Sequence, residues 1–206
     1  MTKRIMGAAA AAMLCVGFSP LRAGMLDLRV GAGLSAANPD AFEQRVKDVS
    51  GSTLRAKTFD TYNADVVFRF PGVPVTLGVR YEQANQKRND AASEWKLNVN
   101  NLALLVDWRL INSAVYVGPI VSVGYPWANL KFHDGANRVD RRIHSNQISY
   151  SGGLEAGVYL GPLLIGAEAG YKSIRFKGDA SAGSSLNAHV DLDGVYGKAL
   201  VGLTFL

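Results

Sequence analysis

The sequence has almost no cysteine: Cys15 is the only one, and it lies within an apolar N-terminal segment. A single cysteine forms no internal disulfide and supplies no cluster of thiolate ligands. Phosphate-binding loops, zinc motifs and nucleotide fingerprints are also missing from the sequence. The sequence therefore predicts neither a cofactor nor a metal site.

The N-terminus has the three parts of a secretory signal. Lys3 and Arg4 precede an apolar run over 5–18, and Leu21, Arg22 and Ala23 form a cleavage site. The run is too short to cross a bilayer as a helix, which disfavours the alternative of a retained anchor. We expect a signal peptide over 1–23 and one domain without cysteine over 24–206.

The sequence has little excess charge once this signal is removed. Its net charge of +5 includes three basic residues of the signal, and 19 basic residues remain against 17 acidic ones, a net charge of +2. Nucleic-acid binding proteins carry a stronger positive patch. The composition therefore gives no indication of a nucleic-acid partner.

A long apolar helix is also missing. The span 111–130 has no charged residue, but Gly118, Pro119, Gly124 and Pro126 interrupt it, and β-branched residues lie between them. This composition favours a strand over a membrane helix.

What the sequence does have is long alternation of apolar and polar residues, clearest over 147–171. Both arms alternate with period two, and Gly161 and Pro162 separate them, which predicts a β-hairpin with a tight turn. Each arm extends for about nine to fourteen residues, longer than usual strands and sufficient to cross a bilayer when tilted.

Similar alternation recurs along the chain and predicts eight strands. We expect them over 25–35, 61–70, 75–84, 95–108, 114–125, 147–160, 163–171 and 195–206. Short connections follow the second, fourth and sixth strands, and long polar ones follow the first, third, fifth and seventh. This layout is typical of outer-membrane barrels, in which short turns are periplasmic and long loops external.

The last strand alternates up to an aromatic residue, Phe205, close to the C-terminus. It resembles the assembly signal of bacterial outer-membrane β-barrel proteins, although Leu206 follows the aromatic residue. The resemblance to the small eight-stranded OmpA/OmpX-like group implies an all-β, antiparallel, up-and-down transmembrane barrel. It also implies the cell outer membrane as location and the barrel-assembly machinery as a partner during biogenesis.

Two aromatic belts are expected on the apolar face. From Phe70 to Tyr62 a tilted strand rises about 20 Å, close to the band of about 25 Å in such barrels. The outer girdle would contain Tyr62, Tyr81, Tyr125, Tyr150 and Tyr171, and the inner one Phe70, Trp108 and Phe205. The alternative is that these aromatics form the core of a soluble barrel such as a lipocalin.

The opposite face carries a balanced set of charges. It contains Asp27, Arg29, Asp65, Arg69, Arg80, Glu82, Asp107, Arg109, Glu155, Glu168, Lys172 and Lys198. An eight-stranded barrel has room for little besides side chains, so these charges should pair in a plugged polar lumen. This predicts a monomer with a structural or surface-interaction role. The alternative is a narrow OmpW-like channel for small solutes.

The connections offer two weaker site hypotheses. His144 with Ser145, Asn146 and Glu155 resembles the set of lipid A deacylase barrels, but the spacing does not place the residues on one lipid-facing wall. We therefore expect no enzyme. The other hypothesis is contact with lipopolysaccharide phosphates through basic residues of the loop 126–146, namely Lys131, Arg138, Arg141 and Arg142.

Three local irregularities are predicted. Asp40 and Glu43 form a capping box for a short amphipathic helix that ends near Gly51. The apolar phase changes at Asn100 and Asn101, which indicates a β-bulge or the point where the strand leaves the bilayer. Pro119 marks a second bulge.

Overall fold

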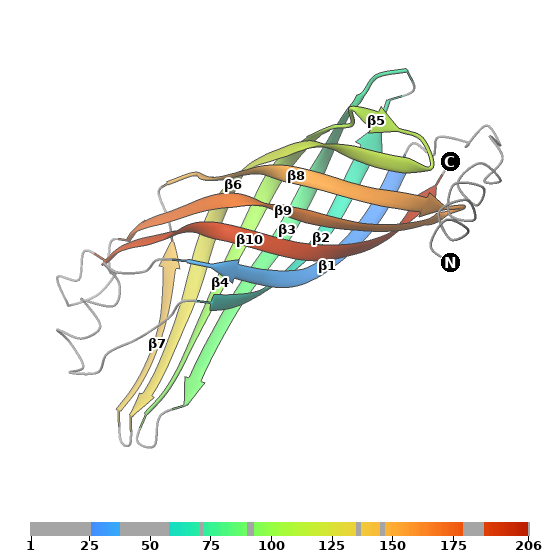
Figure 1. Cartoon of the computed structure of the whole chain (residues 1–206). Helices are drawn as coiled ribbons and strands as arrows, with labels where there is room; N and C mark the ends of the chain where they lie inside the picture. Colours follow the sequence, from blue (N-terminus) through green and yellow to red (C-terminus); the bar gives the residue numbers. More distant parts are fainter. Residues whose placement is uncertain are drawn as a thin grey trace, which may run out of the picture.

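The computed structural model describes residues 26–37, 58–70, 72–89, 93–134, 137–144, 147–178 and 188–205. These residues form one antiparallel sheet of ten strands (Figure 1). The strands are β1 (Leu26–Ala36), β2 (Thr58–Arg69), β3 (Val75–Asn89), β4 (Ser93–Trp108), β5 (Ile111–Asn112), β6 (Val115–Asp134), β7 (Asn137–His144), β8 (Ser149–Leu160), β9 (Leu163–Gly178) and β10 (Ala188–Phe205). The predicted signal peptide and the predicted helix near 40–51 lie outside the described residues.

Eight of these strands close into a barrel. Along the chain β1, β2, β3, β4, β6, β8, β9 and β10 each pair with the next, and β10 pairs with β1. Leu26 at the start of β1 lies opposite Phe205 at the end of β10. The predicted eight-stranded antiparallel up-and-down barrel is confirmed. No helix in the described part of the chain is long and apolar enough to cross a membrane.

The short connections lie at the end of the barrel where Leu26 and Phe205 meet. One of them is the Gly161 and Pro162 turn between β8 and β9, which joins the paired residues Leu160 and Leu163. Gly161 has φ +65°, a value that the first position of a type II′ hairpin turn requires and that a side chain disfavours. We call this end of the barrel the turn end.

At the opposite end four strands continue beyond the rest. In Figure 1, β3, β4, β6 and β7 project past the ends of β8, β9 and β10. Strand β4 stays paired with β6 as far as Ser93 and Asp134, and β7 pairs with β6 from Trp127 onwards. The prediction of a loop over 126–146 is therefore wrong for most of that span. We call this four-stranded sheet the extension.

The predicted bulge at Asn100 and Asn101 is also wrong. The register between β3 and β4 stays unbroken from Val75 opposite Trp108 to Asn89 opposite Glu94. What changes there is the environment of the strand, because the barrel ends and the extension begins. The second interpretation of the phase change, a strand that leaves the bilayer, agrees with this geometry.

The irregularity predicted at Pro119 is present, but the extra residue is not on the strand of Pro119. It lies on the facing strand, where β4 ends and β5 begins. Pro119 pairs with Leu154 of β8 within a continuous ladder. On the other side the ladder with β4 ends where Asp107 faces Ile120, and β5 begins one residue out of step. Because proline has no N–H to donate, a break in the ladder costs least at this position.

Gly118 lies beside this break and allows the two backbones to approach closely. A Cβ at Gly118 would lie 1.8 Å from the carbonyl oxygen of Trp108, whereas a Cβ at Gly197 would meet nothing within 4 Å. We expect Gly118→Ala to lower the free energy of unfolding by about 1–3 kcal/mol, because the backbone has to shift. Urea unfolding in lipid bilayers measures this, with Gly197→Ala as the control. Equal stability of the two variants would contradict the described packing.

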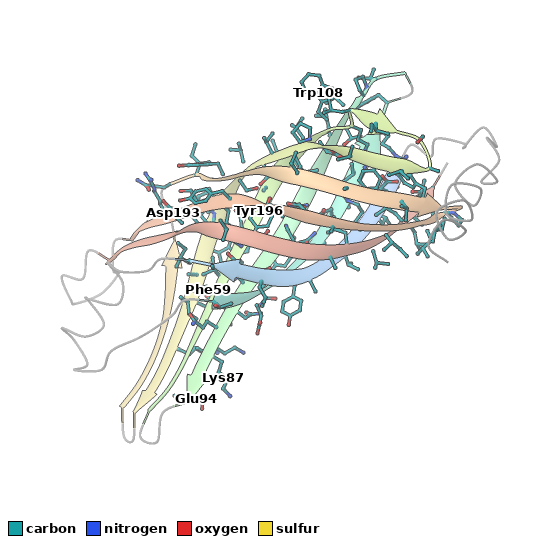
Figure 2. All side chains as sticks on the ribbon, in the orientation of Figure 1. Phe59, Lys87, Glu94, Trp108, Asp193 and Tyr196 are labelled. Carbon is teal, nitrogen blue, oxygen red and sulfur yellow. The ribbon has the colours of Figure 1, made fainter. Side chains whose placement is uncertain are left out.

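The barrel is apolar outside and polar inside. Its outward residues include Leu28, Val30, Val66, Leu104 and Val201, each at least 40% exposed. The eight aromatic residues of the two predicted girdles are all exposed as well, and Figure 2 shows Trp108 projecting away from the wall. So large an exposed apolar surface is unfavourable in water and suits contact with lipid.

Candidate functional site: the charged lumen

The structure places all twelve charged residues of the predicted set inside the barrel. Each is at most 9% exposed. Alternation along the strands turns them inward, and pairing between strands brings together residues that are far apart in sequence. We describe them as three clusters, beginning at the turn end.

The turn-end cluster contains Asp27, Arg69, Asp107 and Arg109. Arg69 donates to Asp27 at 2.6 Å, and the Arg109 Nε donates to Asp107 at 2.8 Å. Arg109 also lies 3.5 Å from the second oxygen of Asp27, which links both pairs. Two acids and two bases are thus held together without excess charge.

Two tyrosines pack on this cluster. The Arg109 guanidinium lies 4.5 Å from the ring centroid of Tyr116, and the Arg69 guanidinium lies 4.8 Å from that of Tyr159. Arg109 also donates to the Tyr159 hydroxyl. Cation–π contacts of this kind stabilise a guanidinium that has lost its water.

The central cluster contains Arg29, Asp65, Arg80, Glu155 and Glu168. Arg80 donates to both oxygens of Asp65, at 2.9 and 2.8 Å, and to both oxygens of Glu168, at 2.8 and 2.7 Å. Arg29 donates to Glu155 at 2.6 Å and to Asp65 at 3.1 Å. Two-pronged arginine–carboxylate pairs of this kind are among the stronger hydrogen-bonded contacts in proteins.

The outer cluster contains Glu82, Lys172 and Lys198. Glu82 accepts from Lys172 at 2.7 Å and from Lys198 at 3.2 Å. Lys198 also lies 3.4 Å from Glu168, so the outer and central clusters are continuous. Together these two clusters contain four acids and four bases.

Several of these contacts cross the whole lumen. Strands β3 and β9 lie four positions apart in the closed order of eight, on opposite walls. Arg80 and Glu82 on β3 contact Glu168 and Lys172 on β9. Side chains therefore meet at the barrel axis at two successive levels.

Between the turn-end and central clusters lies an apolar layer that sequence reasoning missed. Val67, Leu105 and Ile120 form one buried cluster, and Tyr116, Tyr159 and Leu164 form another. Val67 stands between Asp65 and Arg69 on the inward face of β2, so strict alternation alone could have identified it.

The other predicted candidates do not form a compact site. The register pairs Lys131 with Asp140, Arg138 with His133, Arg141 with Leu130 and Arg142 with Asn129, which spreads the four basic residues along a hairpin. Glu155 is fully buried in the lumen, so it cannot join His144 on a lipid-facing wall. Ser145 and Asn146 lie outside the described residues. Among the described residues no group of three acidic, histidine or cysteine side chains could hold a metal ion.

Solved structures contain the same fold. The attachment invasion locus protein Ail of Yersinia pestis matches with a TM-score of 0.52 and 16% identity, over 88% of this chain and 97% of Ail. Neisserial surface protein A matches with a TM-score of 0.54 and 14% identity, over 87% and 97%. A major outer membrane protein from Thermus thermophilus matches with a TM-score of 0.51 and 15% identity, over 87% and 98%. No protein-family model and no curated protein matches the chain.

These likenesses show the fold, which is that of small outer-membrane β-barrels, as predicted. The exposed apolar residues of the barrel wall are independent evidence, from this chain alone, that the barrel contacts lipid. A closed barrel with a charged interior and an apolar exterior is the form that crosses a membrane with strands. The chain is accordingly an integral outer-membrane β-barrel protein.

Proposed function

We propose that this protein is a non-enzymatic outer-membrane barrel with a closed lumen and a structural or surface-interaction role. The observation that supports this most directly is the pairing of Arg80 and Glu82 with Glu168 and Lys172 across the lumen. An ion that passed this level would have to separate buried charge pairs. Leaving such charges unpaired in a low-dielectric interior is costly.

The apolar layer supports the same proposal. Ions that crossed between the turn-end and central clusters would pass Val67, Leu105 and Ile120, which are at most 2% exposed and offer no polar group. With the lumen filled, the outer surface and the extension remain for interactions. We propose a monomer surrounded by outer-membrane lipid and lipopolysaccharide and inserted by the barrel-assembly machinery.

Conductance distinguishes this proposal from a narrow OmpW-like channel. We expect purified protein in planar bilayers to give no discrete current steps, since the charge pairs and apolar layer leave no continuous polar path. A porin measured in the same bilayers is the control for the assay. Discrete openings that scale with the amount of inserted protein would favour the channel instead.

A further inference from the structure

Three lysines form a row across the outer face of the extension. Lys87 of β3 lies opposite Lys96 of β4, and Lys96 lies opposite Lys131 of β6. All three side chains are exposed. The row ends at β7, where Asp140 is the backbone partner of Lys131. We call Lys87, Lys96 and Lys131 the lysine row.

The lysine row lies on the outer face of the wall, the same face as the apolar residues that contact lipid, and it lies beyond the tyrosine girdle. Lys87 has the parity of the exposed residues Val79 and Tyr81 on β3. It is six residues beyond Tyr81, which is about 15 Å further from the barrel centre along the axis. Figure 2 shows Lys87 and Glu94 near the far end of the extension. The row therefore stands above the hydrocarbon region and not within it.

Amide side chains fill the space between the girdle and the row. Across β3, β4 and β6 the register places Gln83 and Asn100 in one line with Trp127, and Asn85 and Asn98 in the next line with Asn129. Tyr81 donates to Asn100 at 2.8 Å, and its ring lies 6.2 Å from that of Trp127. From the tyrosine girdle towards the tip of the extension, the side chains on the outer face change from aromatic to amide to cationic.

The lysine row is electrostatically unfavourable by itself. Like charges directly opposite one another on neighbouring strands repel. Lys87 has a counter-charge in Glu94 at 2.9 Å. Lys96, in the centre of the row, makes no hydrogen bond or ion pair with any residue that the structure describes. Lys131, like Lys87, has an interaction of its own, so an anion placed over Lys96 would neutralise the one lysine of the row that has no such contact among the described residues.

We propose that the lysine row and the amides beneath it bind the phosphorylated saccharide headgroup of an outer-leaflet glycolipid. The order of side chains matches such a lipid: acyl chains against the apolar belt, sugar hydroxyls and amides against asparagine and glutamine, and phosphate against lysine. Amides both donate to and accept from hydroxyls, and lysine is a common phosphate ligand. The inference rests on the proposed surface-interaction role and deepens it. If the short turns are periplasmic, as the sequence predicts, the extension at the opposite end of the barrel lies at the cell surface.

Binding of defined lipids to the full-length barrel in detergent micelles tests the site. The probes are bisphosphorylated lipid A, the same lipid after removal of both phosphates, and phosphatidylglycerol. We expect the native protein to prefer the bisphosphorylated form.

Lys96→Gln should weaken that binding about fivefold, the approximate effect of one cationic side chain near an anionic surface. Lys87→Gln, Lys96→Gln and Lys131→Gln together should weaken it more than about tenfold. Arg175→Gln, an exposed outward cation on β9, should leave it unchanged.

Two results would overturn the inference: unchanged lipid A affinity in the triple variant, or equal binding of phosphatidylglycerol and lipid A by the native protein. If the triple variant does not fold, Lys96→Gln carries the test, because an exposed substitution of this kind is rarely destabilising. A gel shift of the unheated protein shows that each variant is folded. The proposed closed lumen is judged by conductance alone, so its failure would be distinguishable from failure of the glycolipid site.

Discussion

Replacing Arg80 by Met is expected to lower the free energy of unfolding by about 3–5 kcal/mol, the usual cost of removing one partner from a buried ion pair. Arg80 is 2% exposed and donates four hydrogen bonds of 2.9 Å or less, two to Asp65 and two to Glu168. Without Arg80, the Asp65 carboxylate still contacts Arg29, and the Glu168 carboxylate still contacts Tyr196 and Lys198. The central cluster would then contain three carboxylates and one guanidinium.

Urea unfolding in lipid bilayers, followed by the loss of the gel shift, measures this effect. Arg175→Met is the matched control, because Arg175 pairs with Asp193 at 3.5 Å on the exposed outer face. Exposed pairs of this kind contribute about 1 kcal/mol or less. Arg80→Lys should fall between the two variants, since lysine keeps the charge and loses the two-pronged geometry. If Arg80→Met and Arg175→Met were equally stable, the cross-lumen pairs would not be a main source of stability.

The inward and outward faces of the barrel could be predicted because they depend only on local geometry. Successive side chains of a strand point to opposite faces, whatever the strand pairs with. Leu104 and Asp107 differ by an odd number of positions, so one faces lipid and the other the lumen. The same reasoning located the tyrosine girdle and all twelve lumen charges.

The partners of those charges could not be predicted from the sequence. Which charges meet depends on the stagger between strands around the whole barrel, and this stagger is a property of the closed structure. Arg80 meets Asp65 on the adjacent strand, but it also meets Glu168 from the opposite wall. No spacing along the chain indicates the second contact.

The loop predicted over 126–146 and the bulge predicted at Asn100 are wrong because the polarity of a segment does not determine its backbone geometry. Leu97 and Val99 have the same inward parity as Leu105, and all three are buried. What changes near Asn100 is the outward face, where lipid-facing Leu102 gives way to Asn100 and Asn98. An apolar pattern can therefore change phase when the strand passes from lipid to water while its register continues unchanged.

Leu104→Arg is expected to lower the free energy of unfolding in bilayers by about 2–4 kcal/mol, the cost of a cation near the middle of the membrane. Leu104 is 69% exposed, and its neighbours on the adjacent strands are Val79 and Val123. It lies between the tyrosine girdle and Trp108, inside the apolar belt. On a protein surface in water, the same substitution would change stability by only about 0.5 kcal/mol.

A second arginine on the same strand separates the effect of lipid from that of the substitution itself. Asn98 has the same outward parity as Leu104 but lies six residues nearer the tip of the extension, beyond the level of the girdle. Asn98→Arg should therefore cost about 0–1 kcal/mol, the value for positions near the interface. Urea unfolding of the two variants in the same bilayers gives the difference directly. If they lose equal stability, Leu104 does not face hydrocarbon, and the fold would have to be that of a water-soluble barrel with an unusually apolar exterior. A loss confined to Leu104→Arg would place the outer boundary of the hydrocarbon between these two positions of β4.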